Sequence, residues 1–303
     1  MKRLLRLGTR GSKLALLQAN RVKQQLIARN PFLTVELVVI HSEGDIDKET
    51  PLSELGGKGI FIRSLEKALV QSKIDIAVHS LKDVTTSLIE GTVLEAFLPV
   101  DSSCDAICLS DHLSGKSLLE LPLNARIATG SLRRKLQLLH FRSDLIIVPI
   151  RGNLDTRLER LKTDNSIDGI MVSEAGLLRF NQHASIDISL DPLSFIPAPG
   201  QGVIVIQSRE NDSEVVSLLQ TINDTTQSAQ SLLELAIVDQ LGFDCQYPLG
   251  LYAQKGETEF LLHAFNAPLV NEGLQAKGRY DTFKVPLSYT TYDINRIAQS
   301  LVK

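Results

Sequence analysis

Four polar turns in this sequence share one design, in which an apolar run typical of a β-strand is followed by an arginine and a helical pattern. The turns are Thr9-Arg10-Gly11-Ser12, Gly130-Ser131-Leu132-Arg133-Arg134, Arg151-Gly152-Asn153 with Arg157, and Ser173 with Arg179. In open parallel sheets, ligands bind at the carboxyl ends of strands, where the N–H groups of the next helix favour an anion. A cation at a helix N-terminus is electrostatically unfavourable, unless a bound anionic ligand makes the interaction favourable. One such arginine is often part of a solvated helix face, but the repetition predicts a site for carboxylate or phosphate groups.

A glycine-rich segment, Gly56-Gly57-Lys58-Gly59, precedes a helical pattern at Ile60–Val70. It lacks the spacing and the terminal Ser or Thr of a Walker A phosphate loop. We therefore interpret the segment as a surface loop, with Lys58 close to the ligand.

His79-Ser80-Leu81-Lys82-Asp83 follows an expected strand at Ile74–Val78. Lys82 and Asp83 fit either a structural ion pair or catalysis, and His79 fits a hydrogen-bonded core residue. Cys245 follows a helical pattern and has no neighbouring cation to ionise its thiol, so its type and position alone favour an inert buried cysteine.

Composition limits the classes of protein that fit. The chain has 303 residues, 43% hydrophobic and 22% charged, which predicts two or three folded domains without long disordered tracts. A net charge of -3 argues against a nucleic-acid partner. The sequence contains no apolar run of signal-peptide or membrane-span length, and its three cysteines are sparse, so we expect a cytoplasmic protein away from membranes. Cys104 and Cys108 lack a paired histidine, so we expect no metal site.

Strand-like and helix-like segments alternate over the first two thirds of the chain, which predicts parallel α/β sheets. The expected strands are Thr34–Ile40, Ile74–Val78, Ala125–Thr129, Asp144–Ile150, Asp168–Val172 and Gly202–Gln207. After about Ser213 the pattern changes to a helix at Thr225–Leu241, strands at Glu259–Ala264 and Leu274–Tyr280, and a helix at Tyr292–Val302. This change predicts a small separate α+β unit.

Two proline-containing segments, Leu98–Ser103 and Ile196–Gly202, interrupt both periodicities. We interpret them as a pair of crossings between two α/β lobes, with the last strand of the first lobe at Gly202–Gln207 and a ligand cleft between the lobes.

In these motifs, taken together and in this order, the chain resembles the porphobilinogen deaminase (hydroxymethylbilane synthase) family along nearly its whole length. The matching runs are Thr9 to Leu16, Gly56 to Phe61, His79 to Asp83, Thr129 to Arg134, Arg151 to Asn153 with Thr156 to Leu158, Ala175 to Leu177 with Arg179, and Gly200 to Gly202. The resemblance implies an α/β fold with two lobes like type II periplasmic binding proteins, two crossovers and a small C-terminal α+β domain. The implied domains are residues 1–98 with 202–218, residues 99–201, and residues 219–303.

The resemblance also implies a reaction. Enzymes of this family condense four porphobilinogen molecules head to tail onto a dipyrromethane cofactor, and they release ammonia and hydroxymethylbilane in haem biosynthesis. By position, Cys245 would hold the dipyrromethane through a thioether, and Asp83 would be the catalytic carboxylate. Each porphobilinogen brings an acetate and a propionate, so many guanidinium groups are needed to bind the growing chain.

The remaining site residues follow by the same matching. The residues that the resemblance implies for cofactor binding are Ser80, Lys82, Thr129, Ser131, Arg133, Arg134 and Arg151. Those that it implies for substrate binding are Arg10, Lys58, Phe61, Arg157, Arg179 and Gln201. We expect porphobilinogen as the partner of a monomeric enzyme.

The chain departs from the family pattern at Thr85, Cys104, Leu235, Phe243 and Asp244. One alternative is therefore a diverged, non-catalytic paralogue that binds an anionic small molecule between the lobes. A nucleic-acid binder is disfavoured by the acidic charge and the few aromatic residues. A cysteine hydrolase would have to pair Cys245 with His263, which we interpret as accidental neighbours in sequence.

Overall fold

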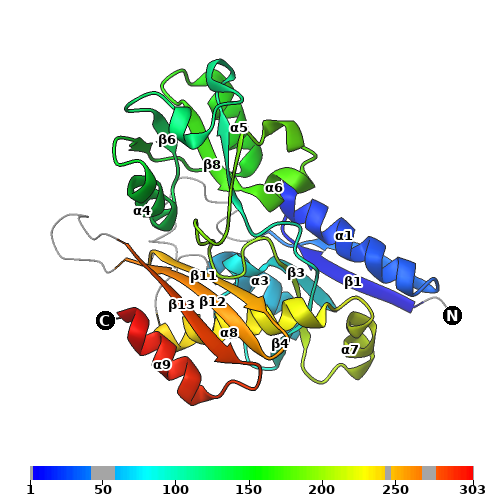
Figure 1. The fold of residues 1–303 in the computed structure, drawn as a ribbon. Helices are drawn as coiled ribbons and strands as arrows, with labels where there is room; N and C mark the ends of the chain where they lie inside the picture. Colours follow the sequence, from blue (N-terminus) through cyan, green and yellow to red (C-terminus); the bar gives the residue numbers. More distant parts are fainter. Residues whose placement is uncertain (1–2, 42–58, 243–246, 268–277, 303) are drawn as a thin grey trace. The chain divides into compact units, whose positions relative to one another are not determined.

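The computed structural model describes residues 3–41, 59–242, 247–267 and 278–302. The chain divides into two compact units, which are treated separately below. Figure 1 labels the helices and strands of both. Unit 1 contains Met1–Val100 and Val203–Ala229, and unit 2 contains Asp101–Gly202 and Gln230–Lys303. Two of the points at which the chain passes from one unit to the other, after Val100 and after Gly202, coincide with the proline-containing segments identified in the sequence. The finer division into three domains stays a prediction.

Unit 1 is built on a five-stranded sheet in the order β2-β1-β3-β10-β4. The strands are β1 (Arg3–Thr9), β2 (Leu33–Val39), β3 (Ile76–Ser80), β4 (Thr92–Phe97) and β10 (Ile204–Arg209). Strand β1 is parallel to β2 and β3, whereas β10 is antiparallel to β3 and β4. The helices are α1 (Lys13–Arg29), α3 (Gly59–Val70), α7 (Ser213–Gln220) and the short 3-10 helix η1 (Leu81–Asp83).

Helix α1 lies along the sheet of unit 1 beside β1 (Figure 1), and its sequence explains both its ends and its buried face. Ser12 caps the N-terminus because its side chain accepts a hydrogen bond from the Ala15 N–H. Ala19, Val22 and Leu26 recur at helical spacing and are fully buried against the sheet.

Unit 2 contains a second five-stranded sheet, in the order β7-β6-β8-β5-β9. Its strands are β5 (Asp105–Leu109), β6 (Arg126–Ala128), β7 (Ile146–Val148), β8 (Gly169–Ser173) and β9 (Ile188–Leu190). Its helices are α4 (Leu132–Phe141), α5 (Leu154–Thr163) and α6 (Glu174–Arg179), with 3-10 turns η2 (Asp111–Leu113), η3 (Leu118–Glu120) and η4 (His183–Ser185). The strands of the two sheets have equivalent positions and directions, with β5 in the place of β10. The predicted two-lobed α/β fold is therefore confirmed.

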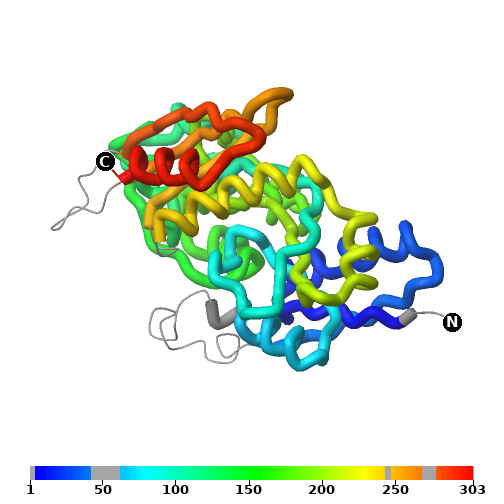
Figure 2. Tube along the Cα trace, turned by 90° about the horizontal axis from the view of Figure 1, so that it is seen from below, coloured from blue at the N-terminus to red at the C-terminus, as the bar shows by residue number. Residues whose placement is uncertain are grey.

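The C-terminal part adds a three-stranded antiparallel sheet in the order β11-β12-β13. Its elements are α8 (Thr225–Leu241), β11 (Leu249–Lys255), β12 (Glu259–Asn266), β13 (Arg279–Pro286) and α9 (Thr291–Val302). Figure 2 shows α9 beside the C-terminal half of α8. Within unit 2 this sheet packs on α4, since Phe265 and Ala267 form one buried cluster with Leu136 and Ile196.

The parallel sheets expected from the sequence are only partly correct. Strand β10, and likewise β5, runs antiparallel to its neighbours. A parallel neighbour requires a crossover connection, usually a helix on the sheet face. Strands β10 and β5 instead begin shortly after the chain enters their unit from the other one. No helical crossover therefore sets their direction. No helix in the described ranges is both long and apolar enough to cross a bilayer.

Candidate active site

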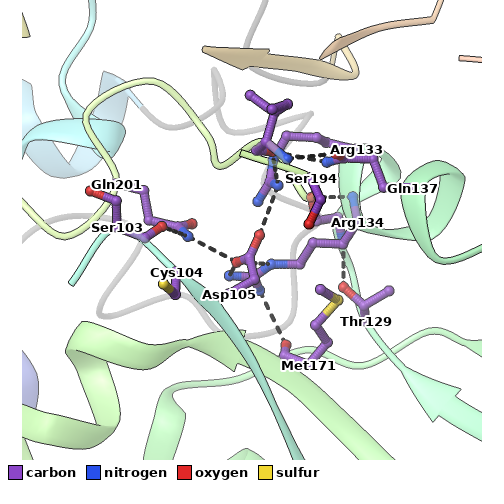
Figure 3. Close-up of polar contacts among 12 residues, drawn as sticks. Ser103, Cys104, Asp105, Thr129, Arg133, Arg134, Gln137, Met171, Ser194 and Gln201 are labelled. Carbon is purple, nitrogen blue, oxygen red and sulfur yellow. Dashed lines mark hydrogen bonds and ion pairs between the residues drawn. The ribbon is translucent and has the colours of Figure 1, made fainter. Parts of the chain in front are cut away.

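A buried ion cluster lies at the start of α4 in unit 2 (Figure 3). The Arg133 Nη1 atom lies 2.8 Å from Asp105 Oδ2, and the Arg134 Nη2 atom lies 2.7 Å from Asp105 Oδ1. Arg134 Nε donates a second hydrogen bond to the same Oδ1, at 2.9 Å. The side chains of both arginines are less than a tenth exposed, and Asp105 is fully buried. Asp105 thus binds both guanidinium groups that the sequence placed at this helix start.

Neighbouring groups hold this cluster in place. Arg133 Nη1 donates to the carbonyl of Ile196 at 2.7 Å, and Arg134 Nη1 donates to the carbonyl of Met171 at 3.1 Å. Gln201 Nε2 donates to Asp105 Oδ1 at 2.9 Å, while Gln201 Oε1 is buried and has no hydrogen-bond partner within the part of the chain that the structure describes. A buried acceptor without a donor is costly, so Gln201 offers an acceptor to a ligand.

The charges of the cluster do not balance. Burial raises the pKa of Asp105, but Arg133 and Arg134 together lower it to about 2, so the carboxylate is ionised at neutral pH. Burial lowers the pKa of Arg157, and the positive charge of Arg134 lowers it further. Arg133 and Arg134 thus share the carboxylate of Asp105, and the guanidinium group of Arg157 lies within electrostatic range of Arg134. Because buried charges are normally paired, this excess of positive charge suits an anionic ligand.

The turn between β6 and α4 aligns the two arginines. An added Cβ at Gly130 would lie 2.8 Å from the carbonyl oxygen of Ile150, so the close approach of the two segments requires glycine. Ser131 caps α4 by accepting a hydrogen bond from the Arg134 N–H, and the Ser131 N–H donates to Thr129 Oγ1. The short turn thus places consecutive arginines in the first turn of the helix.

In unit 1 the predicted residues gather at the carboxyl ends of β1 and β3. Ser80 ends β3 and accepts a hydrogen bond from Gln18 Nε2 at 2.8 Å. Burial lowers the pKa of His79 to about 4, while the charge of Asp83 raises it and that of Arg10 lowers it. Arg10 and Asp83 therefore both lie within electrostatic range of the same imidazole. His79 is the hydrogen-bonded core residue expected, since its Nε2 lies 3.0 Å from Gln207 Oε1.

The predicted residues thus fall into two groups and a remainder. Unit 2 brings together Thr129, Ser131, Arg133, Arg134, Arg157 and Gln201, and unit 1 brings together Arg10, Ser80, Lys82 and Asp83. Arg151 is exposed, and Arg179 binds Asp101 and Gly202. Lys58 and Cys245 lie outside the described residues, as do Phe243, Asp244 and the side chain of Phe61.

Sequence reasoning missed Asp105, which binds the arginines, and Gln18, which binds Ser80. Asp105 did carry a signal, because it is a charged residue directly before the apolar run of β5, where it becomes fully buried. Buried carboxylates are rare without a partner. Gln18 lies on the buried face of α1 and is likewise polar among apolar neighbours.

Comparisons with known proteins decide the family. A family model described as porphobilinogen deaminase, dipyromethane cofactor binding domain, matches residues 5–217. The chain belongs to the porphobilinogen deaminase family. It is 43% identical over 251 residues to a porphobilinogen deaminase of a Wolbachia strain from Drosophila simulans, covering 83% of this chain and 84% of that protein. It is 45% identical over 249 residues to the enzyme of Dichelobacter nodosus, covering 82% and 80% respectively.

Among solved structures, the methionine-binding protein MetQ overlaps 77% of this chain and 94% of its own, at 16% identity and a TM-score of 0.44. The family predicted from the sequence motifs is confirmed by the family model and the curated relatives.

Proposed function

We propose that this member of the porphobilinogen deaminase family condenses four porphobilinogen molecules head to tail on a covalently bound dipyrromethane. The reaction releases ammonia and hydroxymethylbilane in haem biosynthesis. The observation that supports it best is that two buried guanidinium groups, those of Arg133 and Arg134, share the one carboxylate of Asp105 in a chain of this family. A carboxylate-rich pyrrole chain supplies the anions that this cluster lacks.

The residues of the cluster suit dipyrromethane. Its acetate and propionate groups would bind Arg133, Arg134 and Arg157, which can each offer paired N–H donors to a carboxylate. The buried Gln201 Oε1 can accept a hydrogen bond from a pyrrole N–H. Thr129 and Ser131 place hydroxyl groups at the same helix start, and Arg151 would bind carboxylates from the surface. When bound, dipyrromethane supplies the nucleophilic pyrrole carbon for the first condensation.

Asp83 is the proposed catalytic residue. In the reaction the C–N bond of the substrate aminomethyl group breaks, and ammonia leaves with the bonding electrons. The positive charge that remains spreads over the pyrrole ring and its nitrogen. A fixed carboxylate at the end of β3 stabilises that charge, and it can move a proton at the pyrrole N–H or at the leaving nitrogen.

The other proposed residues act by binding. Lys82 and Ser80 bind the cofactor beside Asp83, and Arg10 binds a substrate carboxylate. Lys58 and Phe61 belong to the segment that precedes and begins α3, and Cys245 anchors the cofactor.

The test of this function is the intact mass of the purified protein together with its colour with Ehrlich's reagent. We expect a mass above that of the sequence by two pyrrole units, and we expect Cys245→Ser to lack that increment. Formation of hydroxymethylbilane from porphobilinogen should accompany the increment. A protein with neither the increment nor ammonia release would be the non-catalytic paralogue.

Asp83→Asn keeps the size of the side chain but removes its charge. Single-turnover addition of porphobilinogen to primer-loaded protein should slow at least roughly a hundredfold, with little change in melting temperature. Near-normal addition would show that Asp83 is a structural residue.

We also propose that the enzyme is monomeric and cytoplasmic and binds no nucleic acid. Light scattering coupled to gel filtration measures its mass in solution, and a mass twice that of the chain would contradict the first point.

A further inference from the structure

Arg179, which the sequence motifs predict to bind substrate, is paired with a carboxylate inside unit 2. It is the last residue of α6, and its side chain is only 8% exposed. Its Nε lies 2.9 Å from Asp101 Oδ2, and its Nη2 donates to the carbonyl of Gly202. Both partners belong to unit 2, and each stands at a point where the chain passes to the other unit.

We name the two pieces of unit 2 that adjoin these passages the connecting segments, residues 101–105 and residues 196–202. Arg179 contacts the outer end of each one. The first segment also binds the start of α6, since the Glu174 N–H donates to the Cys104 carbonyl at 3.1 Å and Ser102 Oγ donates to Glu174 Oε2 at 3.1 Å. Helix α6 therefore holds the first segment at both ends of the helix.

The two connecting segments are also bound to each other further inside the unit. Gln201 Nε2 donates to the carbonyl of Ser103 and to Asp105 Oδ1, each at 2.9 Å. Asp105 is the carboxylate that binds Arg133 and Arg134. A shift of either segment would therefore move a direct partner of the arginine cluster.

We propose that Arg179 is a positioning residue, which fixes the two connecting segments so that Gln201 and Asp105 hold Arg133 and Arg134 in their binding geometry. In this role its guanidinium binds protein groups and not a carboxylate of the substrate. The inference rests on the proposed function, because Arg133 and Arg134 are the cofactor-binding groups that it positions.

Three charge-changing variants test this role. Arg179→Gln removes the ion pair from one side, Asp101→Asn removes it from the other side, and the double variant removes both. Asp144→Asn serves as the matched control, because Asp144 forms a close ion pair with Arg142 at 2.7 Å in the same unit. The carbonyls to which Arg142 also donates belong to Leu118, Leu119, Leu121 and Pro122, which lie in neither connecting segment.

The first measurement is hydrogen exchange of backbone amides in the connecting segments, which does not depend on catalysis. We expect exchange at the amides of Gly200 and Gln201 to rise roughly tenfold or more in both single variants, because a partly buried charged hydrogen bond is lost. The double variant should exchange no faster than the faster single variant. Asp144→Asn should exchange like the wild type at these amides.

The second measurement is steady-state kinetics, which separates positioning from substrate binding. A positioning role predicts that Asp101→Asn and Arg179→Gln lower kcat by similar factors, and that Arg179→Lys, which can keep one of the two contacts, recovers part of the loss. If Arg179 binds a substrate carboxylate, Arg179→Gln will raise KM while Asp101→Asn leaves KM unchanged or lowers it, and the proposal is then wrong.

The intact mass of each variant separates this proposal from the proposed function. A wild-type protein without the dipyrromethane increment would contradict the proposed function, while the exchange data would still decide whether Arg179 fixes the segments. Unchanged exchange in both single variants would overturn the positioning role even in a fully active enzyme.

Discussion

Replacing Asp105 with asparagine should destabilise unit 2 more than any comparable change at an exposed ion pair. Both carboxylate oxygens of Asp105 accept hydrogen bonds from arginine side chains. Asparagine keeps one acceptor oxygen but turns an amide N–H₂ group towards a guanidinium donor. Two buried guanidinium groups would then lack their carboxylate.

The structure bounds the magnitude in two ways. The pKa of Asp105 falls from 3.8 to about 2 on folding, which corresponds to about 2 kcal/mol of stability in the ionised form. Removing one partner of a buried ion pair costs about 3–5 kcal/mol in other proteins. We therefore expect Asp105→Asn to lower the free energy of unfolding of unit 2 by about 2–5 kcal/mol at pH 7.

Hydrogen exchange of core amides in β5 and β8 measures this loss within unit 2, without assuming that the whole chain unfolds in one step. The control is Asp164→Asn, which breaks the partly exposed pair between Arg160 and Asp164, at 3.2 Å. Asparagine keeps the Oδ1 atom that accepts both hydrogen bonds from Ser166, so this change should cost little. Because the folded pKa is lowered, the contribution of Asp105 is present above pH 3.8 and is lost as the pH falls through about 2. If Asp105→Asn costs no more than Asp164→Asn, the ion cluster does not stabilise the unit and the reasoning is wrong.

Three further predictions concern buried groups elsewhere. Burial lowers the folded pKa of His79 from 6.5 to about 4, so acid favours the unfolded state. The free energy of unfolding of unit 1, measured from the protection factors of β3 amides, should therefore fall by about 2 kcal/mol between pH 7 and pH 5. His79→Gln should abolish that fall. For Glu234 the pH dependence of stability is reversed, because burial raises its pKa from 4.5 to about 7 although the backbone N–H groups of Gly200 and Ala253 favour its ionised form. The protection factors of β11 amides, which are exchange rates corrected for the intrinsic rate at each pH, should therefore be higher at pH 5 than at pH 7, and Glu234→Gln should remove that difference. Gly130→Ala should lower the melting temperature, with a cost of about 1–3 kcal/mol, because its Cβ would meet a backbone carbonyl at 2.8 Å; an unchanged melting temperature would show that the turn relaxes freely.

Local patterns in the sequence were sufficient for the parts of the fold that depend on neighbours along the chain. The helix expected at Thr225–Leu241 has those bounds in the structure, and the strand expected at Thr34–Ile40 is displaced by one residue, as β2. Helical and strand periodicities depend on a few adjacent residues, so they can be read without knowing the fold. The order of the arginine and glycine motifs likewise identified the family.

Contacts between distant residues were decided only by the tertiary structure. Asp105 and Arg133 are 28 positions apart, and Asp101 and Arg179 are 78 apart, so no periodicity links them. The sequence motifs placed both arginines at helix starts and predicted that both bind carboxylates, whereas in the structure Arg179 is the last residue of α6. Their partners differ because β5 brings Asp105 to the start of α4, while α6 ends beside the connecting segment that precedes β5. The order of the strands in the sheet thus determines which partner each guanidinium group meets. Arg133 meets a buried carboxylate in a cluster with excess positive charge. Arg179 instead meets a carboxylate and a carbonyl at the points where the chain passes between its two units.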